Sequence, residues 1–245
     1  MDQQRTYRNL VNTKRLFAFR VMVEETDLMV HAGKELKSET KKLVLKQRGY
    51  LKAYIKAHPK FAGSLTPWRL VGWAPPIVAD MVEAGANAGI GPMAAVAGAV
   101  AEHAGRGLLS FTDDVIVENG GDVFIKTSTP ITVGIFAGKS PLSLRIGIRI
   151  DGGPEPTAVC TSSGTVGHSL SFGKADAVCV VAKSCAIADA AATAIGNNVR
   201  SASDIQNAID NGKGIAHIRG VIVIVGKKIG IWGDLELVSL KGKNA

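Results

Sequence analysis

The chain has 245 residues, of which 46% are hydrophobic and 20% charged, an ordinary composition for a globular protein. This length allows one large domain or two small ones with a sizeable core. The formal net charge of +8 arises in residues 1–60, which hold 14 Lys and Arg against 6 Asp and Glu. No apolar run approaches the roughly 20 residues of a membrane-spanning helix, so we expect no membrane partner.

The first predicted elements are a β-hairpin over 15–31 and a long basic helix over 34–57. The basic surface is either a solvated helix face or a surface that meets nucleic acid or nucleotide phosphates. No known nucleic-acid motif is present, so nucleic acid is not the expected partner. Residues 58–76 are predicted to be an irregular segment that either packs on the core or covers a cleft with its two tryptophans, Trp68 and Trp73.

Two helices are expected next, over residues 76–87 and from Pro92 onward. The second is small and apolar on every side until Glu102, which predicts that it is buried. Its N-terminus presents free backbone N–H groups, so it is a candidate anion site.

The second half begins with a hairpin around Asn119-Gly-Gly-Asp122. That segment is either only a turn or a source of amide and carboxylate groups for a sugar or metal. Further strands are expected at 131–136, 142–150, 158–162 and 175–182, and again in the last 25 or so residues. Helices are expected over 184–197, capped by Ser184, and 203–211, capped by Ser203. Hairpins and paired helices favour an α+β fold with an antiparallel sheet over a doubly wound one.

The three cysteines, Cys160, Cys179 and Cys185, match no zinc or redox spacing. Their odd number, without a signal peptide, predicts a reducing compartment and a cytoplasmic protein. We assign Cys160 to strand packing rather than to a nucleophilic role.

A Ser/Gly-rich loop over 161–173 allows backbone N–H groups to approach a phosphate, although a plain surface loop fits the same composition. Its His168 is a candidate base, metal ligand or stacking group, with a structural role as the alternative. Asp189 and Thr193 lie four residues apart and share one helix face. They predict either a site for a hard metal ion or a buried pair hydrogen-bonded to a neighbouring loop.

Several motifs occur in the order and spacing of the ApbE-like superfamily, which includes the FAD:protein FMN transferases. They are Asn119-Gly-Gly-Asp122, Thr161-Ser-Ser-Gly164 and Ala188-Asp-Ala-Ala-Ala-Thr193. The segments Gly91-Pro-Met-Ala-Ala-Val-Ala-Gly and Gly164-Thr-Val-Gly-His-Ser-Leu-Ser-Phe-Gly-Lys-Ala-Asp176 resemble the short, uncharacterised branch of that superfamily. The resemblance to that branch covers most of the chain, whereas the match to the transferases is confined to about 110–197.

The resemblance implies one ApbE-like domain over 1–245, with an antiparallel sheet, helix pairs on one face and two T-fold-like halves. It implies that Asp189 and Thr193 hold Mg²⁺ on the FAD pyrophosphate, and that His168 is the catalytic candidate. The expected flavin- or nucleotide-binding residues are Asn119, Gly120, Gly121, Asp122, Thr161, Ser162, Ser163 and Gly164.

The transferases carry a His-x-x-Asp-Pro-x-Thr-Gly motif, whereas this chain reads His168-Ser-Leu-Ser-Phe-Gly173. Two hypotheses about function therefore stay open. One is a Mg²⁺-dependent enzyme, transferase-like or cleaving the FAD pyrophosphate. The other is a non-catalytic module that binds a flavin, pterin or nucleotide, with a homo-oligomer as a further expectation.

Overall fold

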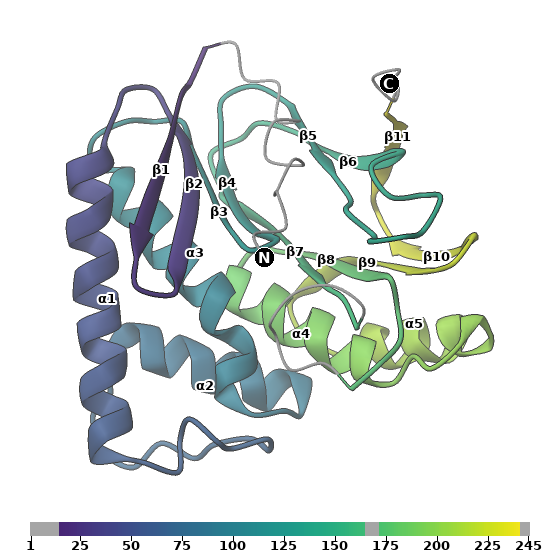
Figure 1. Cartoon of the computed structure of the whole chain (residues 1–245), viewed down its shortest axis with the longest axis horizontal. Helices are drawn as coiled ribbons and strands as arrows, with labels where there is room; N and C mark the ends of the chain where they lie inside the picture. Colours follow the sequence, from purple (N-terminus) through teal and green to yellow (C-terminus); the bar gives the residue numbers. More distant parts are fainter. Residues whose placement is uncertain (1–14, 165–171, 241–245) are drawn as a thin grey trace.

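The computed structural model describes residues 15–164 and 172–240. An eight-stranded antiparallel sheet, in the order β1-β2-β3-β4-β7-β8-β9-β10, forms its middle layer (Figure 1). Its strands are β1 (Phe17–Val23), β2 (Thr26–Ala32), β3 (Val115–Asn119), β4 (Asp122–Lys126), β7 (Thr157–Ser162), β8 (Ala177–Ala182), β9 (Ile218–Val225) and β10 (Lys228–Gly233).

A second, three-stranded sheet in the order β11-β6-β5 packs on one face of the large sheet, over β3, β4, β7, β8 and β9. Its strands are β5 (Ile131–Gly134), β6 (Ile146–Ile150) and β11 (Glu236–Ser239). A core of branched aliphatic side chains fills the space between the two sheets. The antiparallel strands expected at the C-terminus would place β11 next to β10. Instead, β11 leaves the large sheet and pairs with β6.

The helices cover the other face of the large sheet, and a second core separates the two layers (Figure 1). They are α1 (Lys37–Ala57), α2 (Pro76–Ala88), η2 (Pro92–Ala95), α3 (Val96–Leu108), α4 (Cys185–Asn197), η3 (Ala202–Asp204) and α5 (Ile205–Lys213). This arrangement confirms the predicted α+β class with an antiparallel sheet and helices on one face. The division into two T-fold-like halves, and the single domain over 1–245, stay predictions.

The sequence explains why the centre of the molecule is so tightly packed. Strand β8 is buried at every position because cores lie on both of its faces, and it is made of Ala, Val and Cys alone. Small residues let the helices approach closely. A Cβ built on Gly98 of α3 would lie 2.3 Å from the backbone oxygen of Cys185 in α4. A Cβ on Gly105 would likewise lie 2.2 Å from the Phe124 ring.

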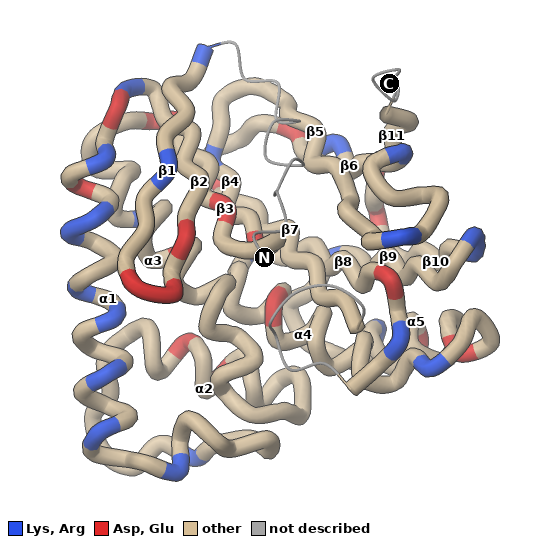
Figure 2. Tube along the Cα trace, viewed as in Figure 1, with Lys and Arg blue, Asp and Glu red and all other residues tan. Residues whose placement is uncertain are grey.

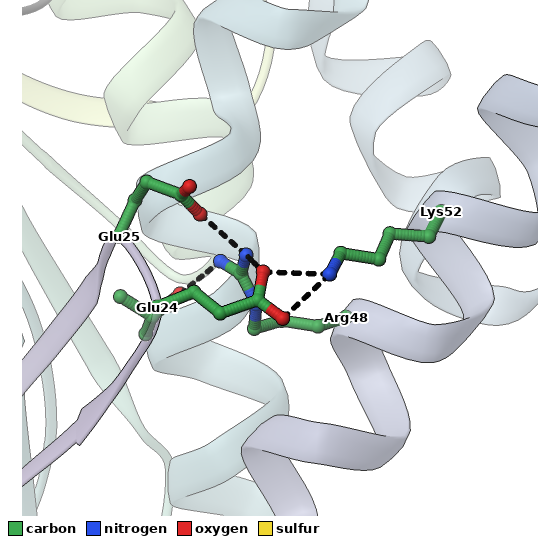
Figure 3. Close-up of polar contacts among 5 residues, drawn as sticks. Glu24, Glu25, Arg48 and Lys52 are labelled. Atoms are coloured by element: carbon green, nitrogen blue, oxygen red, sulfur yellow. Dashed lines mark hydrogen bonds and ion pairs between the residues drawn. The ribbon is translucent and has the colours of Figure 1, made fainter.

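An ionic cluster joins the tip of the first hairpin to the basic helix (Figure 3). Arg48 of α1 donates hydrogen bonds to Glu24, to Glu25 and to the hydroxyl of Thr26, and Lys52 donates to Glu24 at 2.6 Å. The Lys52 and Arg48 hydrogen bonds hold the pKa of Glu24 below its usual value. The other Lys residues of α1 lie along its outer side, which accounts for the basic N-terminal part (Figure 2).

One local prediction needs correction, and another is resolved residue by residue. The N-cap of η3 is Ser201, not the predicted Ser203. Ser201 forms a capping box with Asp204, and Ser203 already lies inside the first turn. The Trp68 ring packs edge-on against the Phe61 ring, with 5.6 Å between the ring centroids, whereas Trp73 is 80% exposed. The two tryptophans therefore play different roles.

Within 15–164 and 172–240, no single helix has the length and apolar composition to cross a membrane. The helix pair 76–88 and 92–108, bent by 108°, passes that test only when taken together.

Candidate functional site

The predicted Asn119-Gly-Gly-Asp122 segment forms the tight turn between β3 and β4. Gly120 and Gly121 have φ angles of 69° and 114°, a region that favours glycine. The Gly121 N–H donates to the Glu118 carboxylate at 3.0 Å, and its carbonyl accepts from the Thr161 N–H at 3.2 Å. The turn is thus fixed against the end of β7, beside the second predicted motif.

Asn119 connects this turn to the helix layer. Its side-chain amide donates to the carbonyl of Ala97, in the first turn of α3, at 3.0 Å. Asn119 and Asp122 are cross-strand partners, and both point to the helix-covered face of the sheet. The structure therefore brings the β3–β4 turn and the start of α3 together.

The sequence predicts the anion site at a helix beginning at Pro92, but Pro92–Ala95 form the short helix η2 and α3 begins at Val96, where the N–H groups meet an acidic side chain of this chain. The Asp189 carboxylate of α4 accepts a hydrogen bond from the Gly98 N–H at 2.9 Å, and the Ala97 N–H also stabilises it. A carboxylate at a helix N-terminus interacts favourably with the free N–H groups and the dipole. The hydrogen-bonded alternative for Asp189 is therefore realised, although it does not exclude a further ligand.

Glu102 of α3 makes the reciprocal contact with α4, and the sequence analysis did not assign it a role. Its carboxylate accepts from the Cys185 N–H at 2.7 Å and from the Ser184 hydroxyl at 2.9 Å. Arg106 donates to the other carboxylate oxygen at 2.9 Å. Glu102 is the first charged residue in a long apolar segment, and a lone buried charge requires partners. That pattern is the signal that could have identified it.

Asp122 and Asp189 form a pair of buried carboxyl groups at the centre of this arrangement. Burial, followed by the negative charge of Asp189, raises the pKa of Asp122 well above its usual value. Burial raises the pKa of Asp189 to about 7, although the N–H groups of Gly98 and Ala97 oppose this shift. Two such groups cannot both ionise without a compensating positive charge.

The side chains of the second predicted motif, Thr161-Ser-Ser-Gly164, lie on both faces of the sheet, because alternate side chains of a strand point to opposite faces. Ser162 lies on the helix side with Cys160, is buried, and its hydroxyl has no hydrogen-bond partner within the described residues. Thr161 points to the other face, where its hydroxyl contacts the Cys179 thiol. The structure therefore associates the Ser162 side chain, but not that of Thr161, with the face that carries Asp122.

The other predicted site residues either lie near these segments or fall outside the residues that the structure describes. Ser163 and Gly164 follow β7 directly, and the Gly164 N–H donates to the Ala175 carbonyl at 3.0 Å. Thr193 is buried on α4, one turn beyond Asp189. His168 lies outside the described residues, so its predicted catalytic role stays a prediction.

The buried cysteines do not have the properties of nucleophiles. The Cys160 thiol donates to the Cys185 carbonyl at 3.4 Å and contacts Asp122. Burial raises the pKa of both Cys160 and Cys185 above the usual thiol value. A thiol with a raised pKa carries little thiolate at neutral pH, which fits the assignment of Cys160 to packing.

The residues present fit a magnesium ion better than a transition metal. Among the described residues, no group of three or more His, Cys, Asp or Glu side chains could hold a metal. Mg²⁺ commonly needs only one or two protein carboxylates, with water and substrate phosphates as its other ligands. The Asp122–Asp189 pair supplies carboxylates of that kind, and burial is the main cause of the raised pKa of both groups.

This arrangement of helices and sheets is similar to that of solved ApbE structures. A mutant of the flavin transferase ApbE from Vibrio cholerae superposes with a TM-score of 0.56 and 12% sequence identity, covering 89% of this chain and 97% of that one. The ApbE protein from Thermotoga maritima gives a TM-score of 0.55 and 15% identity, covering 88% of this chain and 96% of that one. At these identities the likeness defines the fold.

The chain belongs to the family described as AbpE bacteria, whose model matches residues 8–232. The UPF0280 protein of Methanocaldococcus jannaschii is 41% identical over 229 residues, which are 91% of this chain and 93% of the relative. The UPF0280 protein of Methanopyrus kandleri is 41% identical over 236 residues, covering 93% and 95% of the two chains. The predicted similarity to an uncharacterised ApbE-like branch is thus confirmed.

Proposed function

We propose that this protein binds a flavin nucleotide such as FAD together with Mg²⁺ and acts on the phosphoester of that nucleotide. The observation that carries the proposal is the pair of buried carboxyl groups, Asp122 and Asp189, which form no ion pair with a basic side chain among residues 15–164 and 172–240. In a chain with the fold of a flavin transferase, this pair fits the magnesium ion that a pyrophosphate would bring.

Each residue near the pair has a distinct role in this proposal. Asp122 and Asp189 would hold Mg²⁺, with the Thr193 hydroxyl as a further oxygen from the same face of α4. When bound, the ion supplies positive charge to the pyrophosphate and to its leaving phosphate. The Ser162 hydroxyl, buried without a partner among the described residues, would donate to a phosphate oxygen. Asn119 would hold the β3–β4 turn against α3.

The reaction would divide FAD at its pyrophosphate. The oxygen of an acceptor hydroxyl, or of water, forms a bond to the phosphorus on the riboflavin side, and the bond to the bridging oxygen breaks. AMP leaves with that oxygen and its electron pair, and the nucleophile loses a proton. With water as the nucleophile, the products are FMN and AMP.

A second candidate function is a binding module that holds a flavin, pterin or nucleotide without chemistry. It is favoured by the hydrogen bond from Gly98 to Asp189, which gives this carboxylate a structural role. The raised thiol pKa values of Cys160 and Cys185 also argue against a covalent intermediate on either cysteine.

Titration calorimetry with FAD tests the binding that both functions share. We expect FAD to bind in the presence of Mg²⁺ and to lose at least about tenfold in affinity with EDTA, since one tenfold step is about 1.4 kcal/mol. Asp122→Asn and Asp189→Asn should abolish the Mg²⁺ dependence while preserving the fold, because an asparagine oxygen still accepts a hydrogen bond. Asp113→Asn, an exposed acid on a loop, is the matched control and should bind as the wild type does.

Turnover separates the two functions. Chromatography of FAD incubated with protein and Mg²⁺ should show FMN and AMP in equal amounts, and Asp189→Asn should reduce both. FAD binding without products would favour the module. If no flavin, pterin or nucleotide binds in either metal condition, both functions are wrong.

A further inference from the structure

Strand β10 is the last strand of the eight-stranded sheet (Figure 1), and no strand within residues 15–164 and 172–240 pairs with its outer edge. A two-residue turn of Gly226 and Lys227 joins it to β9. The backbone N–H and C=O groups of its even-numbered residues therefore form the hydrogen bonds to β9. The backbone N–H and C=O groups of Ile229, Ile231 and Gly233 therefore point away from the sheet. The side chains of Ile229 and Ile231 are 37% and 44% exposed.

An open, partly apolar edge is a template for another strand, and proteins usually protect such edges with proline, bulges or inward-pointing charges. Strand β10 contains no proline, and its pairing with β9 is regular from Lys228 to Gly233. The only charged residue of the strand is Lys228 at its start, and the acid Asp234 directly follows its last residue, Gly233. Within 15–164 and 172–240, neither residue forms an ion pair with this chain.

We propose that β10 pairs antiparallel with β10 of a second copy of this chain, with the twofold axis at Ile231. This register joins only outward-pointing backbone groups, because Ile229 lies opposite the partner's Gly233 and Ile231 lies opposite the partner's Ile231. It also brings Lys228 near the partner's Asp234, the residue that directly follows the strand, at both ends. Oppositely charged residues directly across a strand pair stabilise it.

The side chains are complementary on both faces of this pair. On the helix side, Trp232 lies opposite the partner's Gly230, which leaves room for the indole. On the other face, the exposed Ile229 and Ile231 gain apolar neighbours from the partner. A register centred on Gly230 would instead place Lys228 opposite the partner's Trp232 and would leave the charges unpaired.

The resulting dimer is closed, because each copy offers the same edge and the symmetry uses both. It joins the two eight-stranded sheets into one continuous sheet. The proposal does not depend on the function of the Asp122–Asp189 site.

Sedimentation velocity over a range of protein concentrations tests the dimer. The wild type should dimerise, and Ile231→Lys should be monomeric because two like charges would meet at the twofold axis. Lys228→Asp alone and Asp234→Lys alone should each weaken dimerisation roughly tenfold, since both attractive pairs become repulsive. Lys42→Asp makes the same charge change on α1, at the far end of the sheet, and should leave dimerisation unchanged.

Mixing the two single charge variants gives the sharpest result. Lys228→Asp chains carry two acids near the strand ends and Asp234→Lys chains carry two bases, so the mixture should form heterodimers that are tighter than the homodimer of either variant. The double variant Lys228→Asp/Asp234→Lys should regain wild-type affinity. A monomeric wild type, or a dimer that none of these changes weakens, would overturn the proposal. Circular dichroism confirms that each variant is folded.

Discussion

Glu102 and Asp189 each cap the helix that carries the other. Glu102 of α3 accepts from the Cys185 N–H at the start of α4, and Asp189 of α4 accepts from the Gly98 N–H at the start of α3. Both carboxylates are buried, and each meets backbone N–H groups that would otherwise lack a partner. The exchange fixes how the two helices cross, and it places Asp189 beside Asp122 on the sheet.

Replacing Glu102 should destabilise the fold because the first N–H group of α4 loses its acceptor. Glu102→Ala leaves the Cys185 N–H buried without an acceptor, and we expect the free energy of unfolding to fall by about 1–3 kcal/mol. Urea denaturation measures the change. Glu83→Ala, an exposed acid on α2, should change stability by less than about 0.5 kcal/mol. Equal losses in the two variants would show that the reciprocal cap does not matter.

A methyl group at Gly98 should be poorly tolerated because the helices meet there. The added Cβ would lie 2.3 Å from the Cys185 oxygen and 2.9 Å from the Asp189 Cβ. Gly98→Ala should cost about 1–3 kcal/mol by forcing the helices apart. Gly49→Ala makes the same change on α1, where nothing lies within 4 Å, and should stabilise the protein by about 0.5–1 kcal/mol. Thermal unfolding of the two variants should therefore shift in opposite directions.

The stability of the metal-free protein should fall as the pH rises toward neutrality. The folded chain holds the Asp189 proton with a pKa of about 7, whereas the ordinary value is 3.8, so the folded state binds more protons between these values. This stabilisation is complete below about pH 3.8 and is lost by about pH 7. The slope should be on the order of 1 kcal/mol per pH unit.

Urea unfolding in EDTA at several pH values measures this slope. Asp189→Asn should make the slope shallower, with the remainder due to the raised pKa of Asp122, whereas Asp113→Asn should leave the slope unchanged. If the wild type is instead more stable at pH 7 than at pH 5, the buried carboxyl pair does not control the pH dependence of stability between these values.

Arg48 should contribute more to stability than its neighbour Lys52, although both bind Glu24. The Arg48 side chain is only 15% exposed and also bonds Glu25 and Thr26, whereas that of Lys52 is 60% exposed (Figure 3). Arg48→Ala should cost about 1–2 kcal/mol because both packing and charge are lost. Lys52→Ala should cost less than about 1 kcal/mol, and that cost should disappear at high salt. Similar losses in both variants would show that burial does not distinguish them.

The sequence by itself determined the elements and much of the candidate site. Alternation of apolar residues identified β1 and β2, glycine and proline placed the turns, and Ser184 was correctly identified as a cap. These features are local, because they depend on backbone preferences within a few residues. The motifs around Asp122 and Asp189 likewise directed attention to the segments that the structure brings together.

Only the tertiary structure decided how the polar groups are paired. No local rule connects Glu102 to Cys185, or Asp189 to Gly98, because each contact joins residues more than 80 positions apart. The same applies to Thr161 and Ser162, which the strand sends to opposite faces, and to β11, which leaves its neighbours for a second sheet. A buried carboxylate is stabilised by whichever donors the packing of helices brings to it, and that packing depends on the whole core.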